Sequence, residues 1–229
     1  MSQVPLSRTQ LAKMVAARFG AGLLGLGLVF FLPSGTLSYW QAWVWLGILA
    51  IPLCVLLVYM FRSNPGLLER RLRFREPQPE QSLIIKLSYI PVLVLFILPG
   101  LDRRFGWSNV PLAVVLGADL LMLLGWFLFM LVLRANSYAS RVVEVEKEQK
   151  LVSSGPYAVV RHPMYLAVML VYLFSPLALG SYWAMIPAVL MIPVLVARIR
   201  GEEKVLLAQL AGYAGYVGRV RYRMIPGVW

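Results

Sequence analysis

The only histidine of the chain and a pair of carboxylates stand at the two ends of a long uncharged run. His162 precedes this run, Glu202 and Glu203 follow it, and the 35 residues of the run itself, 163–197, carry no charge. If the run folds as a helical hairpin, the imidazole and both carboxylates meet at one face of a membrane. A carboxylate there can bind a cationic group, and Arg198, which shares a helix face with Glu202, can bind an anionic one. The pattern predicts a polar ligand site at a bilayer surface, in an enzyme that acts on a lipid-like substrate.

The residues around His162 predict a turn followed by a helix. Gly155-Pro156 is a turn signal, Pro163 suits a first helical turn, and Tyr165 follows one turn beyond His162. The free N–H groups of such a helix start can receive an anionic or carbonyl group. A purely structural histidine is the alternative. No metal site is expected, because one histidine and one cysteine supply too few ligands.

The composition is that of a membrane protein. Apolar residues make up 60% of the 229 residues and charged residues 14%, well below the roughly 25% of a soluble domain. The net charge of +12 does not indicate a nucleic-acid partner, because the basic residues adjoin apolar segments. Membrane orientation and attraction to anionic lipid headgroups explain them better.

Six apolar segments are candidates for membrane spans, each near the roughly 20 residues that a spanning helix needs. The first four are residues 14–32, 39–61, 83–101 and 110–133, and the last two divide the run 163–197 at a turn near Leu179-Gly180-Ser181. Each arm of that pair has only about 17 residues and is barely long enough to cross. We therefore expect an all-α, polytopic membrane helical bundle of about five to six transmembrane helices, with a C-terminal helical hairpin and a cytosolic cofactor pocket.

Charge bias predicts the orientation and the organisation of the chain. With the N-terminus inside, 20 of the 22 Lys and Arg residues fall on inner segments, and only Arg103 and Arg104 fall outside. Both termini are therefore expected in the cytoplasm. Residues 1–135 are expected to form the N-terminal membrane segments, with a basic interfacial loop at 62–82 that contains an amphipathic helix. Residues 136–229 are expected to form the catalytic region.

Three further features have open interpretations. Asp119 lies inside an apolar segment, where it could serve function, pair with Arg18 or sit protonated in a packed interface. The tail interleaves aromatic and basic residues, which suits a lid at the headgroup level or plain membrane anchoring. Residues 143–148 alternate with period two and are expected to be extended rather than helical.

Two parts of the sequence resemble a known family. The stretch from Gly155 through Arg161-His162-Pro163-Met164-Tyr165, an apolar hairpin, Glu202-Glu203 and then Tyr213-x-x-Tyr216 are similar to the isoprenylcysteine carboxyl methyltransferases and their bacterial relatives. Phospholipid N-methyltransferases share this signature. The resemblance implies S-adenosylmethionine as cofactor, and residues that line it: Gln149, Lys150, Leu151, Val152, Tyr157, His162, Pro163, Met164, Tyr165 and Glu202. It also implies that Arg198 faces the substrate. Gln149 stands where the eukaryotic enzymes often carry His.

The resemblance leaves two kinds of methyl acceptor open. A carboxylate is ionised at neutral pH and needs no base, and Arg198 would orient it. An amine must lose a proton, and Glu203 is the nearest candidate base. The expected partner is thus a lipophilic small molecule or lipid-modified acceptor that enters from the membrane lipid. Isoprenylcysteine-type O-methylation ranks first among the expected reactions, and phospholipid N-methylation ranks second. Two further alternatives rank lower. An NADPH-dependent sterol-type reductase is disfavoured because Leu166-Ala167 follow Tyr165 where such reductases carry Gly and Glu. A small transporter is disfavoured because no inverted repeat is visible in the sequence.

Overall fold

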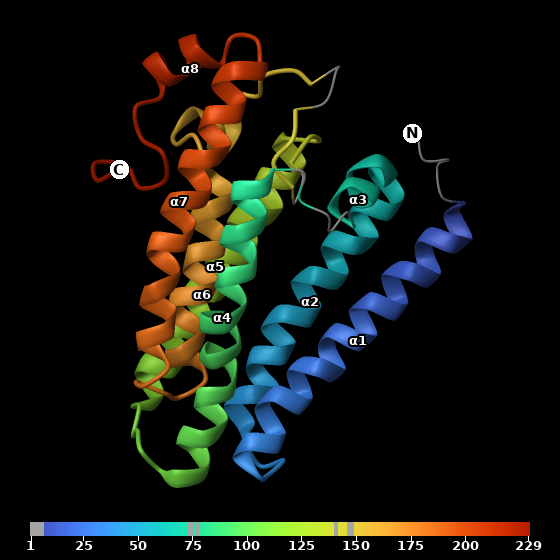
Figure 1. The fold of residues 1–229 in the computed structure, drawn as a ribbon. Coiled ribbons are helices and arrows are strands. Elements are labelled where there is room, and N and C mark those ends of the chain that lie inside the picture. The colour runs from blue at the N-terminus through green and yellow to red at the C-terminus, as the bar shows by residue number, and fades with distance from the viewer. Residues whose placement is uncertain (1–6, 73–75, 77, 140–141, 146–148) are drawn as a thin grey trace.

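The computed structural model describes residues 7–72, 76, 78–139, 142–145 and 149–229, and of Arg70 only the backbone. Long helices run between the two ends of the molecule, and the two nearest the N-terminus (blue) lean away from the others towards one end (Figure 1). They are α1 (Arg8–Ser34), α2 (Trp40–Ser63), α4 (Pro79–Phe105), α5 (Leu112–Ala135), α6 (Pro163–Ala178) and α7 (Met185–Gln209), with the short α3 (Pro65–Arg71), the 3₁₀ turn η1 (Gly155–Ala158) and α8 (Tyr213–Arg219) between and after them. The described residues contain no strand.

Four of these helices, α1, α2, α4 and α5, are long and apolar enough to cross a membrane. The helix α6 is apolar but has only 16 residues, which is about 24 Å of helix against a hydrocarbon core of about 30 Å. The apolar part of α7 ends at Ala197, and the helix continues for three more turns through charged residues. The protein is therefore an all-helical polytopic membrane bundle, as predicted, with four full-length spans and a shorter hairpin of α6 and α7.

The hydropathy pattern located the four spans well, and the helices extend beyond each apolar segment at one or both ends. The turn between α6 and α7 includes Gly180, whose φ of +76° is a conformation that glycine adopts without strain. At its start, α1 has a capping box between Ser7 and Gln10, and it ends at Gly35 in the left-handed conformation. Residues 143–145 form no regular structure, and the rest of the segment predicted to be extended, 146–148, lies outside the described residues.

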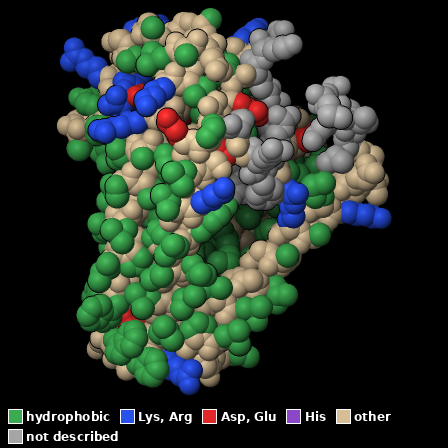
Figure 2. Space-filling model, in the orientation of Figure 1, with side chains coloured by type: hydrophobic (Ala, Val, Ile, Leu, Met, Phe, Trp, Pro, Cys, Tyr) green, Lys and Arg blue, Asp and Glu red, His purple; other side chains and the backbone are tan. Residues whose placement is uncertain are grey.

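One end of the bundle gathers the short elements and the charges. The start of α1, α3 and α8 lie at this end, which we call the α8 end (Figure 1). Figure 2 shows hydrophobic side chains along the length of the bundle and most of the visible Lys, Arg, Asp and Glu side chains towards the α8 end. This distribution agrees with the charge bias of the sequence, and we retain the prediction that the α8 end faces the cytosol.

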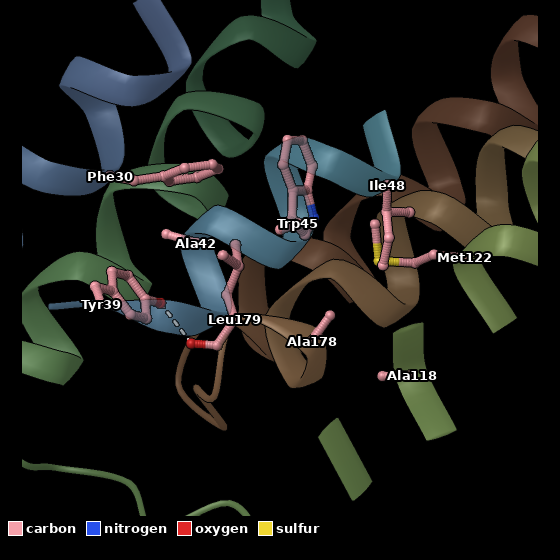
Figure 3. Close-up of a cluster of buried hydrophobic side chains, with 9 residues drawn as sticks. All are labelled: Phe30, Tyr39, Ala42, Trp45, Ile48, Ala118, Met122, Ala178 and Leu179. Carbon is pink, nitrogen blue, oxygen red and sulfur yellow. Dashed lines mark hydrogen bonds between the residues drawn. The ribbon is translucent and has the colours of Figure 1, made fainter. Parts of the chain in front are cut away.

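Near the opposite end, α1, α2, α5 and α6 meet in a cluster of buried side chains (Figure 3). The ring of Trp45 packs edge-on against those of Phe30 and Phe96, with centroids 5.1 and 5.3 Å away. The hydroxyl of Tyr39 donates to the backbone carbonyl of Leu179, a bond that joins α2 to the α6–α7 turn. The carboxylate of Asp102, at the end of α4, accepts from the hydroxyls of Ser108 and Ser181 and so ties two connections of this end together.

The structure bears on two features of the N-terminal half that the sequence singled out. The helix predicted around Leu67 exists as α3, but Leu67 and Leu68 pack into a protein cluster with Leu11, Leu56 and Leu133, so their apolar face is covered by protein rather than by lipid. Of the three interpretations of Asp119 that the sequence left open, the pair with Arg18 does not form. The carboxylate of Asp119 is buried without a hydrogen-bond partner among the described residues, and Arg18 donates to the carbonyl of Leu72.

The contact of α1 with α4 depends on Gly100, and its replacement by Ala is expected to destabilise the protein by about 1–3 kcal/mol. A Cβ atom there would lie 2.8 Å from the backbone oxygen of Phe30 and 3.0 Å from Pro33 Cβ, so the two helices would have to separate. The measurement is thermal unfolding in detergent. Gly117→Ala is the matched control, because nothing lies within 4 Å of its added methyl group. Equal midpoints for the two variants would contradict this account of the packing.

Candidate functional site

The hairpin of α6 and α7 brings its two polar ends together at the α8 end. The segment before α6 is held by the C-terminal tail, because the N–H groups of Arg161 and His162 donate to the carbonyls of Tyr222 and Arg223. Pro163 then occupies the first turn of α6, as predicted. The charged end of α7 returns beside this segment, with His162 Nε2 3.3 Å from a carboxylate oxygen of Glu203. The predicted meeting of His162 with the acidic pair is thus confirmed.

Glu203 lies at the centre of a buried cluster of basic groups. Its two carboxylate oxygens accept from Arg161 Nε and Arg223 Nε, each at 2.7 Å, and its side chain is 8% exposed. Arg161 also donates to the backbone carbonyls of Val220 and Arg221, both at 2.8 Å. Burial acts to raise the pKa of Glu203, but the hydrogen bonds from His162, Arg223 and Arg161 outweigh it and lower the pKa to about 2. The cluster joins α6, α7 and the tail into one unit.

Glu202, the next residue to Glu203, has different surroundings. Adjacent residues of a helix point about 100° apart, so one carboxylate enters the buried cluster while the other faces a cavity. In the cavity wall, the hydroxyl of Tyr165 donates to Glu202 Oε2 at 2.7 Å. Glu202 therefore presents an oriented negative charge to any ligand bound there.

Arg198, one helical turn before Glu202, also lines the cavity and is fixed by residues of the N-terminal half. Its guanidinium forms an ion pair with Glu76 (Nη2 to Oε2, 3.2 Å) and donates to Gln81 Oε1 at 3.2 Å. The side chain of Glu76 is only 2% exposed and also accepts from the backbone N–H of Val143 at 3.1 Å. Glu76 and Gln81 were not predicted as part of the site.

The cavity, which we call the polar cavity, comprises about 850 Å³ of space, part of which is open solvent at its mouth. Ten of the twelve residues named from the sequence line it: Gln149, Lys150, Leu151, Val152, Tyr157, His162, Met164, Tyr165, Arg198 and Glu202. Pro163 is buried behind this wall at the start of α6, and Glu203 lies in the ion cluster. The structure brings these residues together, and their individual roles stay predictions.

No site role was predicted for the residues of the remaining walls. One is the stretch after α5, which contributes Asn136, Tyr138, Ala139, Val142, Val143 and Glu144, and another is the apolar side of α7 with α8, which contributes Val205, Leu206, Leu210, Tyr213 and Tyr216. The Tyr213-x-x-Tyr216 pattern was a usable signal, since both tyrosines face inward and are buried rather than anchored in lipid. The hydroxyl of Tyr216 donates to the carbonyl of Tyr157 at 2.6 Å, and Asn136 donates to the Tyr157 hydroxyl at 3.0 Å.

The arrangement can bind a ligand with both charged and apolar parts. Glu202 suits a cationic group, Arg198 an anionic one, and Leu151, Leu206 and Leu210 an apolar ring. Burial raises the pKa of both Tyr157 and Tyr216 to about 12, so that these hydroxyls stay protonated at neutral pH. The polar cavity is thus a preformed site in which charges of both signs are held by the protein.

Comparison with known proteins identifies the same part of the chain. Residues 112–212 match the family model described as phospholipid methyltransferase. This stretch of 101 residues runs from the start of α5 to the residue before α8, and it contains all twelve residues named from the sequence. No curated protein matches the chain. The region that builds most of the polar cavity is therefore similar to the phospholipid methyltransferases.

Proposed function

We propose that the protein is an integral membrane methyltransferase that uses S-adenosylmethionine and a lipid-like acceptor. The observation that carries the proposal is the polar cavity, which places Glu202, Tyr165 and Arg198 on one wall within the stretch that matches the phospholipid methyltransferase model. That match also favours methyl transfer over the reductase and the transporter. S-adenosylmethionine supplies an already activated methyl group, so the protein mainly has to position the reactants and exclude water.

The residues of the polar cavity fit this cofactor. Glu202 provides a carboxylate for its ammonium group, and Tyr165 fixes the orientation of that carboxylate. The side chains of Leu151, Leu206 and Leu210 offer an apolar surface for its nucleoside. Gln149, Lys150 and Val152 would complete the wall on the side of the cytosolic loop, and Tyr157, His162 and Met164 the wall around the start of α6.

We further propose that the acceptor group is a carboxylate, as in isoprenylcysteine-type O-methylation, and that Arg198 orients it. A guanidinium that Glu76 and Gln81 already hold in place loses little freedom when it binds an anion. An ionised carboxylate needs no base. The contacts of Glu203 favour a positioning role, because a group with a pKa near 2 that is held by three basic side chains is a poor proton acceptor.

The second candidate is N-methylation of an aminophospholipid, which the description of the matching family model favours. An amine acceptor must lose a proton, and Glu144 and Glu202 are the carboxylates that line the polar cavity among the described residues. In either case the acceptor's apolar part would stay in the bilayer. We propose that the reaction takes place at the cytosolic face of a bacterial inner membrane, the face that the charge bias predicts for the α8 end.

The test is incubation of the purified protein in detergent with methyl-labelled S-adenosylmethionine and separate prenylcysteines, fatty acids and aminophospholipids. We expect label in a neutral methyl ester of a carboxylate acceptor, released by mild base. Label in a base-stable amine product would replace the first candidate with the second. The absence of both binding of the cofactor and transfer to any acceptor would overturn the proposed function.

A further inference from the structure

An apolar groove lies between α1 and α2, in the half of the bundle away from α8, where these two helices join (Figure 1). Leu24 is one of its exposed apolar side chains, and the rings of Phe31 and Trp43, with centroids 4.6 Å apart, connect its two walls. Gly27 and Gly47 leave room in it, because nothing lies within 4 Å of a Cβ atom added at either. Since both helices are long and apolar enough to cross a membrane, the groove fits an acyl chain of the surrounding lipid.

A guanidinium stands at the end of this groove. Gly35 lines the groove in the left-handed conformation, and a Cβ atom added there would lie 3.8 Å from Arg104 Cζ. Arg104 is exposed, lies over the ring of Phe105 at 5.8 Å from its centroid, and forms no ion pair with any residue that the structure describes. Thr36, also in the wall, accepts from the N–H of Ser38 at 3.0 Å, which leaves its own proton to donate. Both groups suit the oxygen atoms of a phosphate.

The charges around the groove end favour an anionic headgroup over a zwitterionic one. Arg103 and Arg104 are both exposed in the last turn of α4. The acidic neighbour Asp102 is 1% exposed, and its carboxylate already accepts from the hydroxyls of Ser108 and Ser181. A zwitterionic lipid would bring its ammonium group beside these two guanidinium groups, whereas an anionic lipid brings only the opposite charge.

The groove is separate from the polar cavity. Gln81, which holds Arg198 in the cavity wall, precedes Arg104 on α4 by 23 residues, or about 35 Å of helix. This length exceeds the hydrocarbon core of about 30 Å, so the two sites face opposite leaflets. A lipid in the groove is therefore not the methyl acceptor, and its binding does not depend on the proposed function.

We propose that the groove binds an anionic phospholipid from the leaflet on the side away from α8. One acyl chain lies between α1 and α2, and the phosphate accepts from Arg104 and Thr36. Of the apolar window of α1, 6% is buried within the protein, so a lipid chain held against α2 adds apolar contact to the least enclosed of the four spans. With the orientation predicted from the charge bias, this is the outer leaflet.

The phosphate contact is tested with the full-length protein in detergent, by adding dioleoylphosphatidylglycerol or dioleoylphosphatidylcholine and measuring bound lipid by native mass spectrometry. The wild type is expected to bind phosphatidylglycerol about 10-fold more tightly than phosphatidylcholine. Arg104→Gln should bind both lipids equally. Arg103→Gln, which removes the same charge from an exposed residue about 100° away on α4, is the control and should keep the preference. A wild type without preference, or equal losses in the two variants, overturns the proposal.

The acyl chain is tested by Gly47→Leu, whose side chain enters the groove. This variant is expected to bind phosphatidylglycerol at least about 10-fold more weakly and to lose the rise in unfolding temperature that the lipid gives the wild type. Gly117→Leu is the matched control, because Gly117 is equally open but lies on α5 outside the groove. Unchanged lipid binding by Gly47→Leu would show that the chain lies elsewhere and would contradict the proposal.

Two further outcomes distinguish the lipid from other occupants. The deacylated headgroup glycerophosphoglycerol is expected to leave the unfolding temperature unchanged, because it has no chain to place in the groove. A rise as large as that with the lipid would show that the phosphate alone is recognised, and the proposal would be wrong. It would be equally wrong if the wild type forms a dimer in native mass spectrometry that Gly47→Leu disrupts and Gly117→Leu does not, since a second copy would then fill the groove.

Discussion

The double variant Arg198→Met with Glu76→Gln is expected to methylate a carboxylate acceptor at least about 100-fold less efficiently than the wild type, measured as kcat/KM. A charge-assisted, two-point contact between Arg198 and the acceptor stabilises the bound acceptor in the transition state by about 3 kcal/mol. Its loss corresponds to the factor of about 100 in kcat/KM. The affinity for S-adenosylmethionine is expected to change by less than about two-fold, because Glu202 and the apolar walls remain. Labelled-product kinetics and ligand titration in detergent provide the two measurements.

The pair has to be changed together. Arg198→Met alone would leave the Glu76 carboxylate, 2% exposed, without its cation and would destabilise the protein by about 3–5 kcal/mol. The double variant removes both charges at similar volume and keeps the fold. Glu80→Gln, on an exposed carboxylate in the first turn of α4, is the control and should behave as the wild type. A double variant that loses cofactor affinity but keeps carboxylate methylation would show that Arg198 binds the cofactor.

Glu203→Gln is expected to destabilise the protein by about 3–5 kcal/mol, since it leaves Arg161 buried with no counter-charge at its Nε atom. The adjacent substitution, Glu202→Gln, should unfold close to the wild-type temperature but bind S-adenosylmethionine at least about 10-fold more weakly. Thermal unfolding and ligand titration of the two variants separate the roles of the neighbouring carboxylates. The reverse pattern, with Glu203→Gln stable and Glu202→Gln unfolding early, would contradict the assignment.

The carboxylate of Glu203 also makes the stability of the folded protein depend on pH in the acid range. The pKa of Glu203 falls from 4.5 to about 2 on folding, so its contribution to stability is fully present above pH 4.5 and is lost as the pH falls towards 2. The difference in unfolding temperature between the wild type and Glu203→Gln should therefore narrow over this range and stay constant above it. A difference that does not depend on pH would show that Glu203 is not bound as an anion in the folded protein.

The spans were predictable because hydropathy depends only on local composition. The predicted segment 39–61, for example, corresponds to α2, Trp40–Ser63, within two residues at each end. The ends of the other helices were missed where a helix continues into polar residues, most clearly in α7, which runs on from Ala197 to Gln209. Charged residues there still form helical hydrogen bonds while their side chains leave the apolar layer, so composition alone marks the membrane boundary and not the end of the helix.

The site was predictable where its parts lie near one another in sequence or flank one hairpin. His162, Tyr165 and Glu202 are of this kind. Glu76 is not, because 122 positions separate it from Arg198 and nothing in its local sequence distinguishes it from the solvent-exposed Glu80. Only the packing of α4 on α7 decides which of the two carboxylates meets the guanidinium. The contrasting roles of Glu202 and Glu203 also required the direction of each side chain, which one sequence does not provide.

Arg198 is held by an ion pair to Glu76 and a hydrogen bond to Gln81. These two contacts limit how such proteins can be recombined and how their sequences can diverge. The stretch 112–212 carries the guanidinium but not its counter-ion, which comes from the connection between α3 and α4. A chimaera that transplanted this stretch alone into a distant relative would place Arg198 in the cavity wall without its ion pair to Glu76 and its hydrogen bond to Gln81. Positions 76, 81 and 198 should therefore change in concert, and their co-variation across species would reveal this wall of the cavity even where no structure is known.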